Sequence, residues 1–273
     1  MLRLPDGFPT VTTPIQLSRA MCGRFALTKS PRDLEEVFAA QVPEFPPLYN
    51  IAPTQPILMV LTGERRRQGS NAPQRKAHLV RWGFVPGWAK DPRSLPRLFN
   101  ARSETAAVKG TFRAAMRHRR ALVPASGFYE WRREGRKRTQ AYWVRPRNGG
   151  LVAFAGLMET WHEPGGSEID TGAILTTAAN SDISHIHERM PVVIREPDFS
   201  RWLDCLNQEP RDVADLLTGA EPGFFEAIPV SDKVNKVTNA GPDLQECMKS
   251  AALAKVEPAR RDIFSEVSQL SLF

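Results

Sequence analysis

The chain has 273 residues, 41% of them hydrophobic, and carries a formal net charge of +7. No stretch approaches the ~20 consecutive apolar residues of a membrane-spanning helix, and the three cysteines, Cys22, Cys205 and Cys247, are too few and too scattered for a disulfide framework. The composition therefore excludes membrane-spanning and disulfide-scaffold proteins and predicts a globular protein of the reducing cytoplasm. The positive charge favours a polyanionic partner such as nucleic acid, although basic runs are equally typical of a solvated surface.

The segment before Met21 does not resemble a targeting signal. Residues 1–20 contain three charged side chains and lack the uninterrupted apolar core of a signal peptide. We interpret residues 1–20 as a start-site artefact or a pro-segment, with translation starting at Met21 or cleavage occurring between Met21 and Cys22. A domain at residues 21–249 and a flexible tail at residues 250–273 would follow.

Both helical and strand patterns occur along the predicted domain. A capped helix is expected at residues 30–38, because a serine and a proline precede apolar residues at helical spacing. Further helical patterns lie at 112–116, 199–206 and 213–217, an exposed loop is expected at 62–74, and strand patterns lie at 57–61, 121–123, 128–131, 141–144, 151–157 and 173–177. Because strands dominate without regular strand–helix alternation, the sequence predicts the α+β class, with a mostly antiparallel, curved barrel-like β-sheet core and peripheral helices.

Cys22 has a distinctive chemistry if it is the N-terminal residue. Its α-amine and thiol then form a 1,2-aminothiol, which condenses with an aldehyde to an imine and closes to a five-membered thiazolidine. An α-amine has an ordinary pKa of about 7.7 to 8.0 and a thiol one of about 8.5, so both groups are partly in their reactive forms near neutral pH.

Four sequence blocks follow one another in a recognisable order. They are Met21-Cys22-Gly23-Arg24-Phe25, Asn100-Ala101-Arg102-Ser103-Glu104, Gly127-Phe128-Tyr129-Glu130-Trp131 and Ile186-His187-Glu188-Arg189-Met190-Pro191. With these blocks the chain resembles the SOS-response-associated peptidase (SRAP) family of abasic-site processing proteins, from about Met21 to about Leu244. The resemblance implies a single compact domain, a monomer without cofactor or metal, and a covalent thiazolidine crosslink between Cys22 and an abasic site in single-stranded DNA, which shields the lesion during replication and the DNA damage response.

Glu130 and Asn100 are the first two candidates for assisting that reaction. In a strand, Phe128 and Glu130 share one face, and burial there would raise the pKa of the Glu130 carboxyl and suit it to proton transfer during sugar-ring opening. The alternative is an edge-strand glutamate facing water, and the resemblance favours the catalytic role. Asn100, by resemblance, orients the cysteine amine or a sugar hydroxyl, since an amide both donates and accepts.

His187 is the third candidate, and the resemblance assigns it proton transfer at the imine and reversal of the crosslink. The alternative is a structural histidine. If the segment were a strand, His185 and His187 would face the same side, as in some metal pairs, but no carboxylate or cysteine cluster completes such a site.

Five residues are candidates for contacts with DNA. By resemblance, Arg24 and Arg102 bind phosphates, and Arg189 lies beside His187; guanidinium groups suit phosphates because they bind bidentately and stay charged. Asn50 matches another family segment near the site, with a turn-forming asparagine as the alternative. Trp88 lies in a Pro-Gly loop, from which an aromatic ring could stack on bases.

The chain ends in Gln269-Leu270-Ser271-Leu272-Phe273. This pentapeptide resembles the motif with which bacterial replication and repair proteins bind the DNA sliding clamp. In that motif Gln269 would be hydrogen-bonded in a small pocket, while Leu270, Leu272 and Phe273 would fill an apolar cleft. The alternative is a terminal helix packed on the domain.

Three functions remain open on these residues. The first is a cytoplasmic, nucleoid-associated DNA-repair enzyme that crosslinks itself to abasic sites, with accompanying autopeptidase (hydrolase) and lyase activity. The second is a thiol peptidase whose N-terminal Cys22 amine is the base for its own thiol and which cleaves its own leader. The third is a non-catalytic binder of single-stranded DNA, for which Cys22 would be dispensable.

Overall fold

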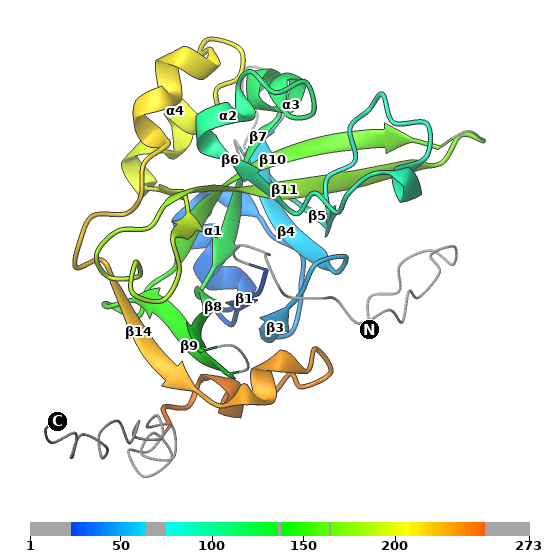
Figure 1. The fold of residues 1–273 in the computed structure, drawn as a ribbon. Helices are drawn as coiled ribbons and strands as arrows, with labels where there is room; N and C mark the ends of the chain where they lie inside the picture. Colours follow the sequence, from blue (N-terminus) through cyan, green and yellow to red (C-terminus); the bar gives the residue numbers. More distant parts are fainter. Residues whose placement is uncertain (1–22, 64–74, 136–137, 164, 249–273) are drawn as a thin grey trace, which may run out of the picture.

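The structure is a computed structural model that describes residues 23–63, 75–135, 138–163 and 165–248 (Figure 1). Residues 1–20, Cys22, most of the predicted loop at 62–74 and the clamp-like tail lie outside the described residues. Within the described part, no helix is long and apolar enough to cross a membrane.

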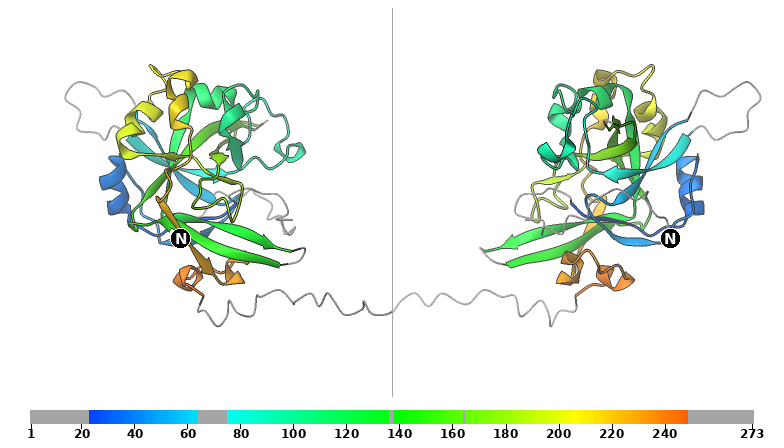
Figure 2. Two further views of the ribbon diagram at one scale, coloured as in Figure 1. Left: turned by 60° about the vertical axis from the view of Figure 1, so that its left-hand side comes forward. Right: turned by 90° about the vertical axis from the view of Figure 1, so that its right-hand side faces the viewer.

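The first sheet is antiparallel and carries the start of the described chain. Its strand order is β14-β9-β8-β1-β3, with β1 between β8 and β3. The strands are β1 (Phe25–Leu27), β3 (Leu48–Ile51), β8 (Gly127–Glu134), β9 (Arg138–Pro146) and β14 (Phe225–Val230). Strands β8 and β9 extend together as a ribbon beyond the body of the protein (Figure 2).

The second sheet closes on itself. Its order is β12-β11-β10-β7-β4-β5-β2, and β11 also pairs with β5, which completes a barrel of β11, β10, β7, β4 and β5. The strands are β2 (Ala40–Gln41), β4 (Pro56–Thr62), β5 (Arg75–Trp82), β6 (Asn100–Arg102), β7 (Arg120–Ala125), β10 (Val152–His162), β11 (Glu168–Ala178), β12 (Arg189–Pro191) and β13 (Val193–Ile194). The prediction of an α+β fold with a mostly antiparallel, barrel-like sheet is thereby confirmed.

Large side chains fill the barrel interior, and one of them packs directly over a glycine. A Cβ atom at Gly172 would lie 2.3 Å from Cε of the buried Met59, so a larger residue at this position of β11 would require the end of the methionine side chain to move. The two sheets are joined by edge-to-face aromatic contacts, in which Phe25 of β1 packs against Trp82 at 5.2 Å and against Phe154 at 6.3 Å between ring centroids. The core therefore fixes β1 to the barrel wall.

Short helices lie around the sheets (Figure 1). The expected helix at 30–38 is present as α1 (Pro31–Phe38): the Ser30 hydroxyl accepts from the Asp33 N–H, the Asp33 carboxylate accepts from the Ser30 N–H, and Ala39 ends the helix with a φ of 47°. The other helices are α2 (Ser103–Ala106), α3 (Arg113–His118), α4 (Phe199–Leu203), and the 3₁₀-helices η1 (Pro92–Ser94), η2 (Glu196–Asp198), η3 (Pro210–Leu216), η4 (Asp232–Asn235) and η5 (Pro242–Gln245).

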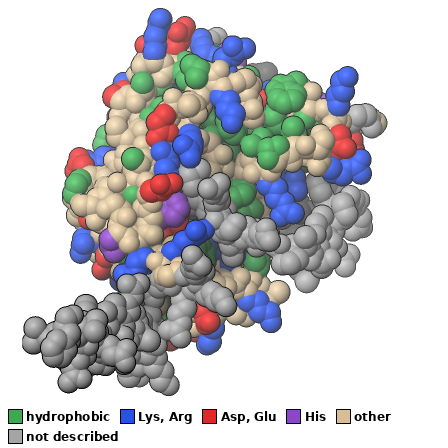
Figure 3. All heavy atoms as spheres, viewed as in Figure 1, with side chains coloured by type: hydrophobic (Ala, Val, Ile, Leu, Met, Phe, Trp, Pro, Cys, Tyr) green, Lys and Arg blue, Asp and Glu red, His purple; other side chains and the backbone are tan. Residues whose placement is uncertain are grey.

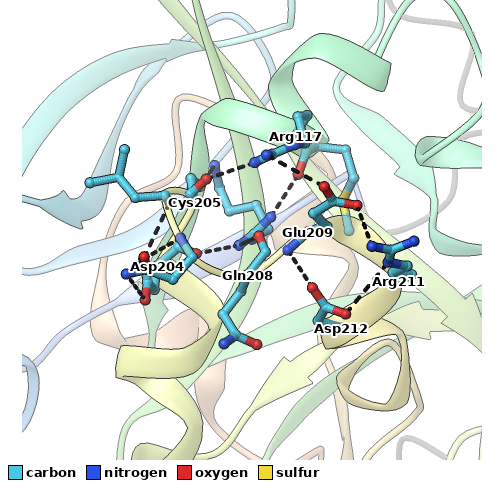
Figure 4. A network of polar contacts seen from close by, with 11 residues as sticks. Arg117, Asp204, Cys205, Gln208, Glu209, Arg211 and Asp212 are labelled. Carbon is cyan, nitrogen blue, oxygen red and sulfur yellow. Dashed lines mark hydrogen bonds and ion pairs between the residues drawn. The ribbon is translucent and has the colours of Figure 1, made fainter.

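Two helix predictions differ from the structure near Arg120. The helix expected at 199–206 ends at Leu203, because the buried guanidinium of Arg120 takes the carbonyl oxygens of Trp202 at 2.7 Å and Asp204 at 3.0 Å. The helical pattern at 213–217 is present as the end of the 3₁₀-helix η3, which stops one residue earlier, at Leu216. Figure 4 shows the surrounding polar network, in which Arg117 donates to the carbonyl of Cys205 at 2.8 Å.

Candidate functional site

The residues that directly follow Cys22 are buried between two parts of the sheet system. Tyr129 of β8 donates its backbone N–H to the carbonyl of Arg24 at 2.9 Å, and a Cβ atom at Gly23 would lie 3.8 Å from Cε2 of Phe99. Phe99 precedes Asn100 in the chain. The described chain, which begins at Gly23, therefore lies beside both β8 and Phe99, the residue that precedes β6.

Glu130 is a buried residue of β8, with 2% of its surface exposed. Its neighbours confirm the predicted alternation: Phe128 packs in the main core, whereas Tyr129 and Trp131 pack in a second cluster on the other face. Glu130 pairs in register with Tyr142 of β9. The expectation of a buried carboxylate is confirmed, and a glutamate facing water is excluded.

Asn100 and Arg102 lie on β6, which runs parallel to β11. Asn100 is half-buried opposite Ile174, and Arg102 is exposed opposite Thr176. The two side chains therefore differ in accessibility, with Arg102 open to a ligand in solution.

His187 lies in a turn that precedes β12. The Ile183 carbonyl accepts the backbone N–H of His187 at 3.0 Å, so this segment is not the strand in which His185 and His187 would share a face. The backbone N–H of Arg189 donates to Nδ1 of His187 at 3.0 Å. The Arg189 carbonyl oxygen lies 3.2 Å from the same Nδ1, so the backbone of Arg189 can hold the His187 ring in either tautomer.

His185, the other histidine of this turn, contacts β9, the strand that pairs with β8. The ring of His185 packs edge-on against Tyr142, the register partner of Glu130, with 6.5 Å between centroids. Among the described residues, no group of three or more His, Cys, Asp and Glu side chains is arranged to hold a metal ion.

Arg189 is buried at the start of β12 and makes a bidentate ion pair with Glu104. Its Nη2 lies 2.9 Å from Oε2 of Glu104 and 2.6 Å from the carbonyl oxygen of Thr176, while its Nη1 contacts Oε1 of Glu104. This hydrogen bonding holds the pKa of the Glu104 carboxyl below its ordinary value. Sequence interpretation missed Glu104, although it is the last residue of the block that begins at Asn100.

Arg24 and Asn50 make their hydrogen bonds inside the protein. Arg24 Nη1 donates to Oδ1 of Asn50 at 2.8 Å and to the carbonyl of Val234 at 2.7 Å, and burial lowers the pKa of its guanidinium. The Asn50 amide donates to the carbonyls of Lys236 at 3.2 Å and Asn239 at 2.8 Å. Asn50 therefore lies in β3 rather than in a turn, and the pair fastens the segment after η4 to the first sheet.

Trp88 lies in a loop that is fixed on β10. Its neighbour Ala89 accepts a hydrogen bond from Trp161 Nε1 at 2.7 Å and packs in a small cluster with Val85 and Trp161, while Trp88 itself is 63% exposed. Such an anchored loop can present an indole ring to a ligand without burying it. Figure 3 shows Lys and Arg side chains spread over the face seen in Figure 1, with histidine among them.

The candidate residues thus fall into groups. The Glu104–Arg189 pair joins two of these groups across β11. Asn100 and Arg102 lie on one side of the strand, and His187 and Arg189 lie on the other. Glu130 lies on β8, next to the strand that continues from Cys22. A carboxylate and an imidazole can each transfer protons, and a primary amide can orient a reacting group through its hydrogen bonds.

Comparison with known proteins places the chain in a family. Residues 21–237 match the model of the family described as SOS response associated peptidase (SRAP). The abasic site processing protein YoqW of Bacillus subtilis is 37% identical over 231 residues, which cover 83% of this chain and 99% of that protein. The abasic site processing protein HMCES of Gallus gallus is 30% identical over 264 residues, covering 84% and 77% of the two chains.

A solved structure agrees on the fold. An X-ray structure of a protein from Bacteroides thetaiotaomicron superposes with a TM-score of 0.69 at 20% identity, covering 84% of this chain and all (100%) of that one. With a family model that spans most of the described domain and relatives of this identity, the chain belongs to the SOS response associated peptidase (SRAP) family.

Proposed function

We propose that this protein processes abasic sites in DNA and that it does so by covalent capture. The α-amine of an N-terminal Cys22 condenses with the aldehyde of the opened sugar and releases water. The Cys22 thiolate then adds to the imine carbon, the nitrogen takes up a proton, and a thiazolidine results. The observation that carries the proposal is the position of Gly23 and Arg24, next to the strand of buried Glu130 and next to Phe99, which precedes Asn100. The names of the relatives support the DNA lesion as the target.

The three supporting side chains take different parts of the proton transfer. Glu130 moves protons to and from the sugar oxygens during ring opening, because a carboxyl group both gives and takes protons and this one is held on the strand beside β1. Asn100 orients the Cys22 amine. His187, whose ring is held at Nδ1 by the backbone of Arg189, acts as the imidazolium: it transfers a proton from Nε2 to the leaving hydroxyl of the carbinolamine and takes one back from the attacking water when the crosslink reverses.

The DNA in this proposal is single-stranded. Exposed Arg102 binds a phosphate beside the lesion, and exposed Trp88 stacks on a base, so that binding follows the backbone and shows little sequence preference. Arg24 and Asn50 act indirectly: with their bonds directed inward, they hold the first residues of the domain against the segment at 234–239.

The C-terminal pentapeptide, which includes Gln269, Leu270, Leu272 and Phe273, lies outside the described residues, and its binding to the sliding clamp stays a prediction. Recruitment by the clamp would bring an abasic-site trap to replication forks and make the protein nucleoid-associated. Deletion of residues 269–273 tests this prediction, because it should abolish capture by immobilised clamp and leave crosslinking unchanged.

Intact-mass analysis tests the central proposal. Protein beginning at Cys22 is incubated with single-stranded DNA that contains one abasic site, and the expected product is the sum of both masses minus one water. Cys22→Ser should bind this DNA reversibly without a thiazolidine, whereas Cys247→Ser, which removes an exposed thiol far along the chain, should react like the wild type. An adduct of equal yield and stability with Cys22→Ser would overturn the proposal. Release of residues 1–21 by the full-length chain, together with no DNA adduct of the protein that begins at Cys22, would instead support a thiol peptidase.

A further inference from the structure

We propose that Glu104 is a positioning residue, which acts through Arg189 to hold the His187 ring and to keep the His187 turn in register with the strand of Asn100. The inference rests on the proposed function, since it assigns Glu104 to the same reaction. It begins from a bidentate ion pair that joins the segments on the two sides of β11.

The pair spans β11. On one side, β6 pairs with β11 through Asn100 opposite Ile174, and Glu104 follows in α2. On the other side, Arg189 of β12 pairs with Ala178 near the end of β11. The Arg189 guanidinium therefore reaches across the strand to the Glu104 carboxylate and connects the two segments that carry Asn100 and His187.

β11, the strand between these two segments, also accepts a hydrogen bond from Arg189. Arg189 Nη2 donates to the carbonyl of Thr176 at 2.6 Å as well as to Glu104, and the Thr176 hydroxyl lies 3.5 Å from the carbonyl of Ala101, which follows Asn100. A planar guanidinium bound at fixed angles by a carboxylate and a carbonyl has little freedom to rotate. The conformation of Arg189 is therefore determined from both sides of β11.

The backbone of this same residue holds His187. Nδ1 of His187 lies 3.0 Å from the backbone nitrogen of Arg189 and 3.2 Å from its carbonyl oxygen, so the position of Arg189 sets the orientation of the imidazole ring in either tautomer. If Glu104 loses its charge, the buried guanidinium, 10% exposed as a side chain, loses its counter-charge and must move toward water. That movement shifts the backbone between residues 187 and 189 and weakens the contacts at Nδ1, so that the imidazole ring is no longer held in one orientation.

Arg189 as a direct phosphate ligand makes the opposite prediction. In that case Glu104, whose side chain is 49% exposed, competes with the DNA phosphate for one guanidinium, and its removal should tighten DNA binding. The positioning role predicts unchanged DNA affinity and slower chemistry. The two roles are therefore distinguished by measuring affinity and rate separately.

The test uses Glu104→Gln in the full domain that begins at Cys22. DNA affinity is measured in the Cys22→Ser background, and crosslinking is measured in single turnover at saturating abasic-site DNA over a range of pH. We expect an unchanged dissociation constant and a rate about tenfold to a hundredfold lower, since small misplacements of reacting groups cost this much, with an altered pH profile. The matched control is Asp215→Asn, which breaks another bidentate pair, with Arg201, between α4 and η3, and should change neither quantity.

Nitrogen NMR of His187 gives a readout that needs no DNA. Glu104→Gln should shift the ring-nitrogen signals of His187 relative to the wild type, because the contacts at Nδ1 change, whereas Asp215→Asn should leave these signals in place. Arg189→Lys, which keeps the charge but not the bidentate geometry, should reproduce this change, and combining both substitutions should add little to either.

These measurements separate the possible failures. Unchanged His187 nitrogen signals together with an unchanged rate, or tighter DNA binding, in Glu104→Gln would overturn the positioning role. Absence of a crosslink in the wild type would instead overturn the proposed function, while the NMR comparison would still show whether Glu104 controls His187.

Discussion

Two buried arginines of this domain, Arg120 and Arg189, bind different kinds of hydrogen-bond acceptor. Arg120, 1% exposed, donates to the main-chain carbonyls of Met116, Trp202, Asp204 and Gln208, at and beyond the ends of α3 and α4. Arg189, 8% exposed, depends on the carboxylate of Glu104, which is itself accessible to solvent. Carbonyls at helix ends carry partial negative charge and do not titrate, whereas a carboxylate can be protonated or displaced. The first arrangement suits permanent structure, and the second suits a site where protons and anionic ligands arrive.

The largest expected effect is on stability, at Arg120. Arg120→Met should lower the free energy of unfolding by roughly 3–5 kcal/mol, because several buried carbonyls lose charged hydrogen-bond donors at once. Urea denaturation measures this loss. Arg201→Met is the control, since its ion pair with Asp215 lies at the surface and should contribute less than about 1 kcal/mol. Similar losses for the two variants would contradict the structural role of Arg120.

The next largest expected effect is on the rate of thiazolidine formation, at Glu130. Glu130→Gln should slow thiazolidine formation by about 10²- to 10⁴-fold while leaving DNA affinity unchanged, because an amide cannot transfer the proton. Single-turnover crosslinking measures the rate. The control is Glu226→Gln on β14, which removes a partly exposed carboxylate that pairs with Arg145. If Glu130→Gln crosslinks at the wild-type rate, the buried carboxylate is structural.

Trp88 should affect binding alone. Trp88→Ala removes a stacking platform and should weaken binding of single-stranded DNA by about 1–3 kcal/mol, to a similar extent for different sequences. Because Trp88 is 63% exposed, the free energy of unfolding should stay the same. Fluorescence anisotropy at fixed salt measures the affinity. Leu206→Ala, at a comparably exposed apolar residue after α4, provides the control, and an equal loss there would argue against stacking at Trp88.

The local sequence pattern predicted those structural features that depend on residues close together in the chain. The capping residues around Ser30 predicted α1, and alternation placed Phe128 and Tyr129 on different faces of β8. The helix expected at 199–206 was too long, because the donor that takes its last carbonyls is Arg120, which is far away in sequence.

The same limit explains what was missed at the candidate site. Glu104 meets Arg189 across 85 residues, and only the pairing of β6 and β12 with β11 brings them together. The sequence block around Arg24 likewise predicted a phosphate contact but not that Val234 would bind its guanidinium. Family resemblance suggested the candidate residues, whereas their contacts depend on the closure of the barrel and on the return of the chain after η4.

The smallest expected effect distinguishes the two arginines by pH. The hydrogen bonds from Arg189 hold the pKa of Glu104 below its ordinary value of about 4.3. A group with a lowered folded-state pKa stabilises the protein fully above its ordinary pKa, and this contribution is lost as pH falls through the lowered value. The Tm difference between the wild type and Glu104→Gln should therefore be constant near neutral pH and disappear in acid. Because the Glu104 side chain is 49% exposed, the contribution should be only about 0.2–1 kcal/mol.

The difference between the wild type and Arg120→Met should persist over the same range, since the carbonyls that bind Arg120 have no proton to gain. If both differences vanish together in acid, then the native packing as a whole is lost there, and the two arginines are not held by different means.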